Sequence, residues 1–185
     1  MTEAKRFEKE DFKDGMPDNS FESCTFHSCT FTGANLRQHK FVDCEFHDCE
    51  LSNVLLTGAV LQGVSFVGCR MLGVHFETLN NILLSFSFAK SALDYSMFQG
   101  LQIHKTSFVD CSMREVDFSD SDLAGSSFRD SQLTGSTFDN TSLIKCDFRG
   151  AQGYIVSPVN NRIKKAIFDR EGLEGLLAEF GIEVE

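Results

Sequence analysis

The sequence lacks several features that would point to a membrane or secreted protein. It contains no tryptophan and only two prolines in 185 residues, and no apolar run approaches 18 residues. A membrane-spanning helix is therefore not expected. Residues 1–6 also lack the apolar core of a signal peptide. We expect a cytoplasmic protein.

Motifs for common catalytic chemistry are missing as well. There is no GxSxG nucleophile turn, no glycine-rich phosphate loop and no HExxH zinc motif. Serine, histidine and aspartate are present, but no spacing brings a nucleophile, a base and an orienting group together. The sequence predicts a protein that is not an enzyme and has no cofactor.

Positive charge is also scarce. The chain has 27 acidic and 17 basic residues, which gives a formal net charge of −10. Nucleic acids and anionic membranes attract basic surfaces. The composition thus argues against direct contact with either one and permits a basic partner.

The sequence does contain an apolar period of five in two long stretches, which start at Phe21 and Phe88. Neither a helix nor a strand repeats every five residues. In the second stretch, Phe alternates with aliphatic residues without a gap. The positions are Phe88, Leu93, Phe98, Ile103, Phe108, Met113, Phe118, Leu123, Phe128, Leu133, Phe138, Leu143 and Phe148.

The positions around each central residue complete the repeating unit. The residue two before the centre is small or apolar, and all seven cysteines fall in this column. The residue two after the centre is often Gly, Asp or Asn, which suit tight turns. Two side chains of each unit thus point inward before the chain turns a corner. The cysteines are expected to be buried, reduced thiols, because they point into the core rather than at each other.

This pattern resembles the pentapeptide-repeat family, for example in residues 124–128 (Ala-Gly-Ser-Ser-Phe) and 131–135 (Ser-Gln-Leu-Thr-Gly). The resemblance covers roughly residues 19–150. It implies an all-β solenoid, a right-handed β-helix of square cross-section with four repeats per coil. Residues 20 apart would stack at about 4.8 Å, so six to seven coils would make a rod roughly 30 Å long. Phe would occupy two opposite faces and aliphatic residues the other two.

Residues 77–87 interrupt the rhythm and divide the rod into two halves. The central positions jump by seven residues, from Phe76 to Leu83. Two extra residues can be absorbed by a bulge or a widened corner. The interruption is either a packing irregularity or a bend or contact surface. It is too short to form a long projecting loop.

The two ends differ from the repeat. Residues 1–18 form an N-terminal segment that either makes an irregular first turn or covers the open end. Residues 151–185 are expected to form a capping or dimerisation module, with a last strand segment around Ile163, Ala166 and Phe168. A helix that starts at Asp169 and ends at Gly181 follows, and Ile182 and Val184 then resemble a short strand. The helix has one apolar face, which either caps its own rod or forms a dimer interface through Leu173, Leu176, Leu177 and Phe180.

The histidines and cysteines do not predict a metal site. His27 and His47 each lie between two cysteines, as in zinc motifs, but the cysteines point inward and these histidines outward. We expect His39 to be a hydrogen-bonded core residue. His75 and His104 are expected to face outward without an evident partner.

Acidic residues outnumber basic ones in the second half, and there they form a candidate partner-binding surface. Arg114, Arg129 and Lys145 are the bases weighed against these acids. The alternative is an ordinary solvated surface. The candidate residues, together with Asp147, are Asp110, Glu115, Asp117, Asp120, Asp122, Asp130 and Asp139.

The tail at residues 160–168, followed by Leu-Leu and Gly-Ile, is similar to a bacterial subgroup of the family. This subgroup includes the Qnr and MfpA fluoroquinolone-resistance proteins and the albicidin and microcin immunity proteins. The resemblance implies an acidic, DNA-like homodimer that binds DNA gyrase or topoisomerase IV. Several Qnr proteins need long loops for drug protection; this chain lacks them, but DNA-like inhibition would not require them. The alternative is a binding scaffold with a partner unrelated to topoisomerase.

Overall fold

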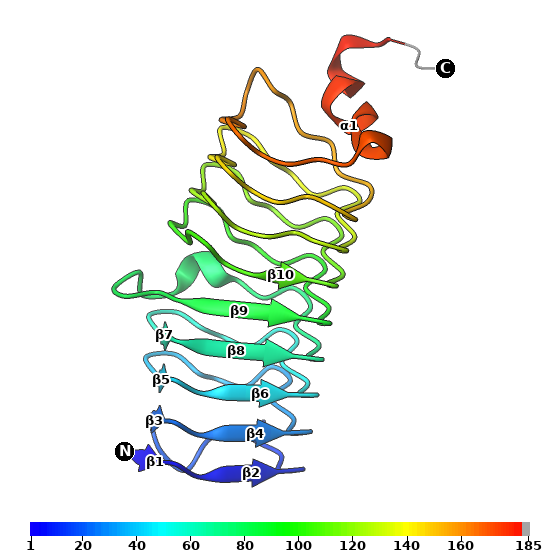
Figure 1. Ribbon diagram of the computed structural model, residues 1–185. Coiled ribbons are helices and arrows are strands. Elements are labelled where there is room, and N and C mark those ends of the chain that lie inside the picture. Colours follow the sequence, from blue (N-terminus) through cyan, green and yellow to red (C-terminus); the bar gives the residue numbers. More distant parts are fainter. Residues whose placement is uncertain (183–185) are drawn as a thin grey trace.

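The computed structural model describes residues 1–182 and shows a rod of stacked coils (Figure 1). Two parallel sheets run along it. The sheet with the order β1-β3-β5-β7 contains β1 (Thr2–Glu3), β3 (Ser20–Glu22), β5 (Lys40–Val42) and β7 (Val60–Gln62). The sheet with the order β10-β9-β8-β6-β4-β2 contains β2 (Arg6–Glu8), β4 (Thr25–His27), β6 (Glu45–His47), β8 (Val64–Val67), β9 (Phe86–Ala89) and β10 (Phe108–Val109).

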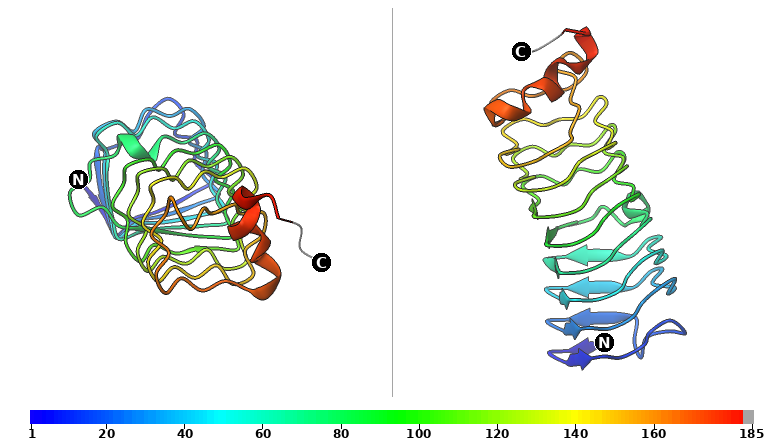
Figure 2. Two further views of the ribbon diagram at one scale, coloured as in Figure 1. Left: turned by 90° about the horizontal axis from the view of Figure 1, so that it is seen from above. Right: turned by 90° about the vertical axis from the view of Figure 1, so that its right-hand side faces the viewer.

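The rod has four faces, which we number in chain order. Face 1 carries the first sheet and continues through the bridges from Gln102 to Arg162, and face 2 carries the second sheet. Face 3 follows the bridges from Thr30 to Gln152, and face 4 those from His75 to Thr137. Figure 2 shows the closed cross-section along the axis. The predicted β-helix is confirmed.

A ladder of stacked phenylalanine rings runs through the interior behind face 2. Successive ring centroids are 4.6–5.4 Å apart, and neighbouring rings are within 19° of parallel. The ladder spans roughly 40 Å, which is longer than predicted because both termini contribute a coil. Its members are Phe7, Phe26, Phe46, Phe66, Phe88, Phe108, Phe128, Phe148 and Phe168.

The expected restriction of Phe to two opposite faces holds only in the second half. There, Phe76, Phe98 and Phe118 begin a second ladder behind face 4. In the first half, phenylalanines also stack behind faces 1 and 3, for example Phe21 on Phe41. The N-terminal end is therefore packed by a wider aromatic cluster.

The small inward column joins neighbouring coils through hydrogen bonds. Ser131 Oγ accepts from the N–H of Cys111 at 2.9 Å and donates to the carbonyl of Phe108 at 3.0 Å. Cys146 Sγ likewise donates to the carbonyl of Leu123 at 3.1 Å. In the last coil, Asn161 takes this role, because it accepts from the N–H of Thr141 and donates to the carbonyl of Phe138.

All seven cysteines are buried and free, as predicted. Burial raises the pKa of Cys44 and of Cys111 to about 11 and that of Cys146 to about 12. These thiols are therefore protonated at neutral pH and act as small core residues that donate weak hydrogen bonds. His39 is also buried, as expected, with its Nδ1 3.1 Å from the carbonyl oxygen of Arg37.

The corners adopt left-handed backbone conformations. Gly150 has φ +74°, and a Cβ there would collide with the carboxylate of Asp130 one coil below. The chain also places non-glycine residues at such corners, among them Asp110 and Lys105. The acidic and basic side chains at the corners therefore project from the edges of the rod.

The interruption forms a short protruding turn on face 1, and the Leu83 prediction is wrong. The N–H of Asn80 still bonds to the carbonyl of Ala59 in the normal register, whereas Val64 pairs with Phe86, 22 positions later. The extra residues therefore lie between Asn80 and Ser85. Leu83 points outward and is 69% exposed, while Leu84 packs against the core. A short 3₁₀ helix, η1 (Phe76–Thr78), precedes the turn.

The N-terminal segment makes the first turn of the rod. Thr2 pairs with Phe21 and Phe7 pairs with Phe26, each at an offset of 19 residues. Of the two possibilities left open for residues 1–18, the structure shows the irregular first turn. One residue fewer in this coil explains why Phe7 and Phe12 are out of phase with the later repeats.

The C-terminal segment comprises η2 (Arg170–Gly172), α1 (Glu174–Leu177) and η3 (Ala178–Phe180). Asp169 precedes it as predicted, but its carboxylate accepts a hydrogen bond from the N–H of Gly150 rather than capping the helix. Gly181 ends the segment with φ +60°, as predicted. No strand includes Ile182, and Val184 lies outside the described residues.

Removing one ring from the ladder should destabilise the rod strongly. We expect Phe108→Ala to lower the free energy of unfolding by about 3–5 kcal/mol, because a fully buried ring leaves a cavity between two others. Urea unfolding followed by circular dichroism measures the loss. Val109→Ala, at the adjacent outward position, is the control. A loss below about 1 kcal/mol for Phe108→Ala would contradict the role of the ladder.

The hydrogen bonds between coils can be tested in the same way. Ser131→Ala should cost about 1–3 kcal/mol, since it leaves the buried N–H of Cys111 without an acceptor. Thr137→Ala, on the surface of the next repeat, should change stability little. Equal unfolding midpoints for the two variants would show that the small column does not join the coils.

Candidate functional site: an acidic face on the second half of the rod

Four of the seven predicted acids lie together on face 4 of the second half. Asp117 bridges Met97 and Thr137 of the neighbouring coils, and Asp139 follows Thr137 by two residues. Glu115 and Asp120 occupy the corners on either side, with φ +55° and +60°. We call Glu115, Asp117, Asp120 and Asp139 the acidic face.

No cationic side chain interrupts this face. Residues 95–100, 115–120 and 135–140 contain the four acids and no Lys, Arg or His. The four carboxylates lie on two successive coils, or about 10 Å of the axis. Duplex DNA carries one charge per about 1.7 Å, so the charge density here is within a factor of about two of DNA.

Local hydrogen bonds hold two of these carboxylates in place. Asp120 Oδ1 accepts from the side-chain amide of Asn140 at 2.8 Å, and Asp117 Oδ1 accepts from the N–H of Ser119 at 2.8 Å. Asp139 and Glu115 are exposed to solvent. The face therefore presents a semi-rigid set of negative charges.

The structure does not bring Asp110 and Asp130 to this face. They stack on one corner, but that corner lies between faces 2 and 3, across the rod. Their backbone N–H groups bond to the carbonyls of Arg129 and Arg149, whose side chains extend from face 2. The predicted seven-residue surface is thus split.

Asp122 and Asp147 each have a side-chain partner, the His104 ring and the Arg149 guanidinium. Asp122 lies 3.0 Å from the Nε2 of His104 on face 1. Burial raises the pKa of Asp122, but hydrogen bonds from the N–H of Ala124 and the ring of His104 lower it by more. The pKa of Asp122 is therefore below the usual value for aspartate. The Arg149 guanidinium, 2.6 Å away, lowers the pKa of Asp147. The expectation that His75 and His104 lack partners is also wrong, because His75 pairs with Glu77 at 2.7 Å.

The predicted dimer residues divide into two groups. Leu173 and Phe180 are 42% and 53% exposed, whereas Leu176 packs against the core and Leu177 is half-buried. Sequence reasoning missed further exposed apolar side chains around them. These are Ile155, Val159, Ile167 and Ile182.

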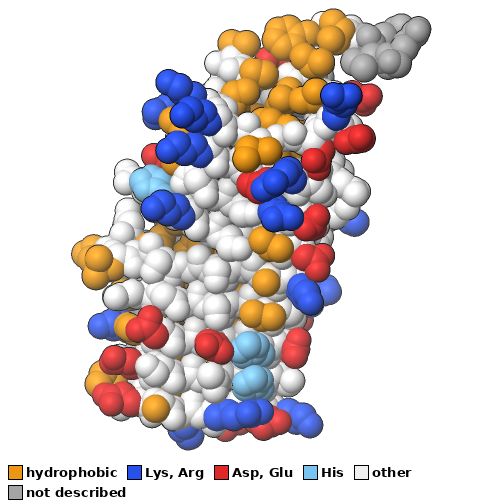
Figure 3. Space-filling model, viewed as in Figure 1, with side chains coloured by type: hydrophobic (Ala, Val, Ile, Leu, Met, Phe, Trp, Pro, Cys, Tyr) orange, Lys and Arg blue, Asp and Glu red, His pale blue; other side chains and the backbone are white. Residues whose placement is uncertain are grey.

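Tyr154 connects the C-terminal segment to the rod. Gly172 and Gly175 lie so close to Tyr154 that a Cβ at either position would collide with it. The N–H of Val156 also donates to the carbonyl of Gly175 at 2.9 Å. The helical segment is therefore docked on the last coil, beside an exposed apolar surface (Figure 3).

Residues 1–182 contain no group of three or more side chains suited to a metal ion. The His27 and His47 rings stack at the surface with their centroids 4.6 Å apart, which agrees with the prediction that both side chains point outward. Within the same described range, no helix is long and apolar enough to cross a membrane.

Comparison with known proteins places the chain in a family. The model of the pentapeptide repeat region matches residues 19–81 and 74–148. No curated protein matches the chain. Similar solved structures include trypsin-treated QnrB1, a plasmid-mediated fluoroquinolone resistance protein. The two sequences are 20% identical, and the alignment covers 100% of this chain and 97% of that chain with a TM-score of 0.47.

Another is HetL, a pentapeptide repeat protein involved in heterocyst differentiation regulation from the cyanobacterium Nostoc sp. strain PCC 7120. It has 13% identity, 89% of this chain and 86% of that chain covered, and a TM-score of 0.35. The family match covers more than half of the sequence and the same five-residue units that form the coils. The chain belongs to the pentapeptide-repeat family.

Proposed function

We propose that this protein is a non-enzymatic DNA mimic that binds a type II topoisomerase, DNA gyrase or topoisomerase IV. The observation that carries the proposal is the acidic face, which places four carboxylates on two successive coils with no cation among residues 95–100, 115–120 and 135–140. Such a face complements a basic groove that normally holds DNA. The protein would inhibit the enzyme or protect it from a drug or toxin by occupying that groove.

The regular coil spacing supports this function. Each coil advances about 4.8 Å, so carboxylates on successive coils form a linear array as phosphates do along a duplex. The side chains of Asp117 and Asp120 are already held by hydrogen bonds. A partner therefore spends little conformational entropy on ordering them.

A homodimer would lengthen the acidic surface. The exposed apolar side chains of Leu173, Phe180, Ile155 and Val159 lie at the C-terminal end of the rod. Joining two copies there would bury them and place two acidic faces in one assembly. We also propose a cytoplasmic location, where buried thiols remain reduced and the chromosomal enzymes operate.

Neutralising the acidic face should abolish topoisomerase binding. We expect the quadruple variant E115Q/D117N/D120N/D139N to bind gyrase or topoisomerase IV at least about tenfold more weakly. It should also lose inhibition in a supercoiling or decatenation assay. The amide side chains keep the local acceptors, so the fold should be retained.

The matched control is E3Q/E8Q/E10Q/D11N, which removes the same charge from the first coil. Equal binding by the two variants would refute DNA mimicry through face 4. An absence of binding by the wild-type protein to both enzymes would favour the alternative, a scaffold with an unrelated partner.

The dimer is tested by its mass in solution. We expect light scattering to give twice the subunit mass at micromolar concentration, and L173E/F180E to give one subunit, because buried carboxylates would disfavour the interface. L55E, at an exposed apolar position on face 4 of the first half, should leave the dimer intact. A wild-type mass of one subunit would contradict the dimer.

A further inference from the structure

Face 1 of the second half is basic, although the protein is acidic overall. Lys105, Lys145 and Lys165 occupy the same corner of the rod with φ between +57° and +63°, and Gly125 takes the position between the first two. Arg162 and Lys164 lie beside them on the last coil, in register with Ser142 through its bridge to Arg162. We call these five residues the basic face. Figure 3 shows basic side chains gathered along this edge.

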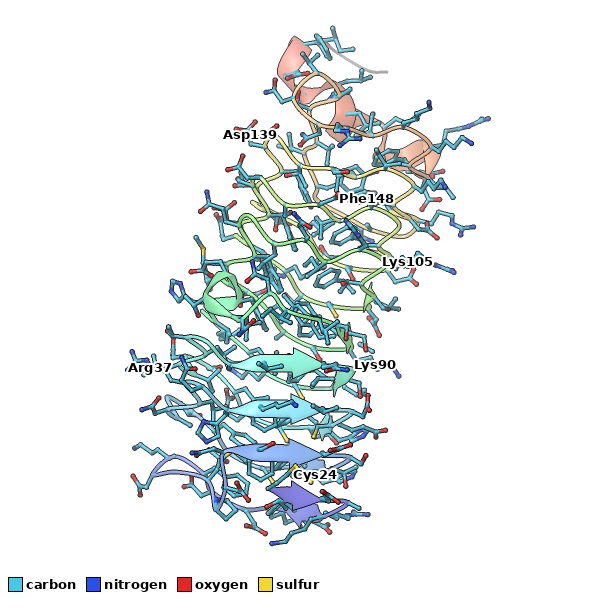
Figure 4. The ribbon with its side chains drawn as sticks, turned by 90° about the vertical axis from the view of Figure 1, so that its left-hand side faces the viewer. Cys24, Arg37, Lys90, Lys105, Asp139 and Phe148 are labelled. Carbon is cyan, nitrogen blue, oxygen red and sulfur yellow. The ribbon has the colours of Figure 1, made fainter. Side chains whose placement is uncertain are left out.

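These cations are available to a partner. All five are exposed, and none forms an ion pair with another described residue. The one carboxylate on this part of face 1 belongs to Asp122, which His104 already holds. In Figure 4, Lys105 and Asp139 lie on opposite sides of the view, in keeping with their places at the corner between faces 1 and 2 and on face 4.

An apolar knob lies on the same face directly below the basic face. Ile82 and Leu83 form the tip of the inserted turn and are 70% and 69% exposed. The turn projects beside β9 in Figure 1. Exposed aliphatic side chains at a rigid tip suit insertion into a recess of a partner.

The knob is held in shape rather than loose. Leu79 is buried and Leu84 packs against the core on either side of the tip. Asn80 Oδ1 accepts from the N–H of Ile82 at 2.9 Å. Leu83 adopts φ +56°, an unfavourable conformation for a leucine. Two large apolar side chains are thus fixed in solvent, an arrangement that points to a contact site.

We propose that the knob and the basic face form a second docking surface, for an acidic protein surface with an apolar recess on the same topoisomerase. This inference rests on the proposed function. The recess would receive Ile82 and Leu83, and the surrounding carboxylates would pair with the cations, as in an interface with an apolar centre and a charged rim. The enzyme would then contact two adjacent faces of the rod, a basic groove on face 4 and an acidic surface on face 1.

The charge arrangement favours a protein over other anionic partners. Asp120, a member of the acidic face, lies at the corner shared by faces 4 and 1. A duplex or a flat anionic membrane would bring its own negative charges against this corner as well. A protein surface can match the narrow basic strip and leave the corner free. DNA also offers no recess for two aliphatic side chains.

The experiment measures binding of immobilised wild-type and variant proteins to purified gyrase and topoisomerase IV. We expect I82S/L83S and K145A/K164A/K165A each to weaken binding by about tenfold. The control for the knob is L55S, an exposed leucine of the first half outside the acidic face, and the control for the cations is K13A/R37A/K90A. These controls remove comparable exposed groups from other parts of the rod.

The outcomes separate this inference from the proposed function. If the acidic-face variant loses binding but both face 1 variants bind as tightly as wild type, only the second docking surface is refuted. If wild type binds neither enzyme, both proposals fail. Short duplex DNA and phosphatidylcholine–phosphatidylserine vesicles are tested in parallel. If the wild-type protein binds the DNA or the vesicles and K145A/K164A/K165A abolishes that binding, the basic face would be assigned to that ligand. This result would overturn the inference.

Discussion

The structure depends on the register of one coil on the next. Backbone hydrogen bonds join each coil to the next. A residue and its counterpart one coil later must therefore occupy equivalent positions in the repeat. Phe26, Phe46 and Phe66 satisfy this with parallel rings. The inward Ser131 and Asn161 satisfy it with bonds to two backbone groups of the preceding coil. Because the interior fixes the register, the outward positions are free to carry any charge pattern.

That freedom explains how an acidic protein can carry a basic face. Each outward column adds side chains at a fixed axial interval, so a few substitutions produce a line of one charge. The acidic face and the basic face arise in this way on adjacent sides of the second half of the rod. A partner that binds around the rod would contact both faces. The exposed knob at Leu83 would fix where along the axis that partner binds. The rod thus carries different charged and apolar side chains on different faces.

The inward residues could be predicted from the sequence because the period of five holds throughout each of the two stretches. Phe108, Leu123 and Cys146 all lie inside as expected. The interruption could not be placed, because a jump of seven residues does not show which of them remain inside. Leu83 and Leu84 are the same residue type, so the sequence does not distinguish them. Only the hydrogen-bond register of Asn80 and Val64 shows which of the two points inward.

The candidate site was predictable only in part. A count of acids groups Asp110 with Asp120, yet four faces per coil place them on different sides of the rod. Pairing also removes charge locally, as Arg149 does for Asp147. The helix residues Leu173 and Leu176 share a face in sequence, but docking on Tyr154 leaves one half-exposed and the other against the core. The partner of Asp122 and the docking on Tyr154 depend on tertiary contacts that the sequence does not show.

The central claim is that the acidic face occupies the DNA site of a type II topoisomerase. The most direct test is competition, measured by the fluorescence anisotropy of a labelled duplex bound to gyrase as this protein is added. The account predicts complete displacement of the duplex, with an apparent affinity that falls steeply as salt is raised. Simultaneous binding of the duplex and the protein to the enzyme would contradict it.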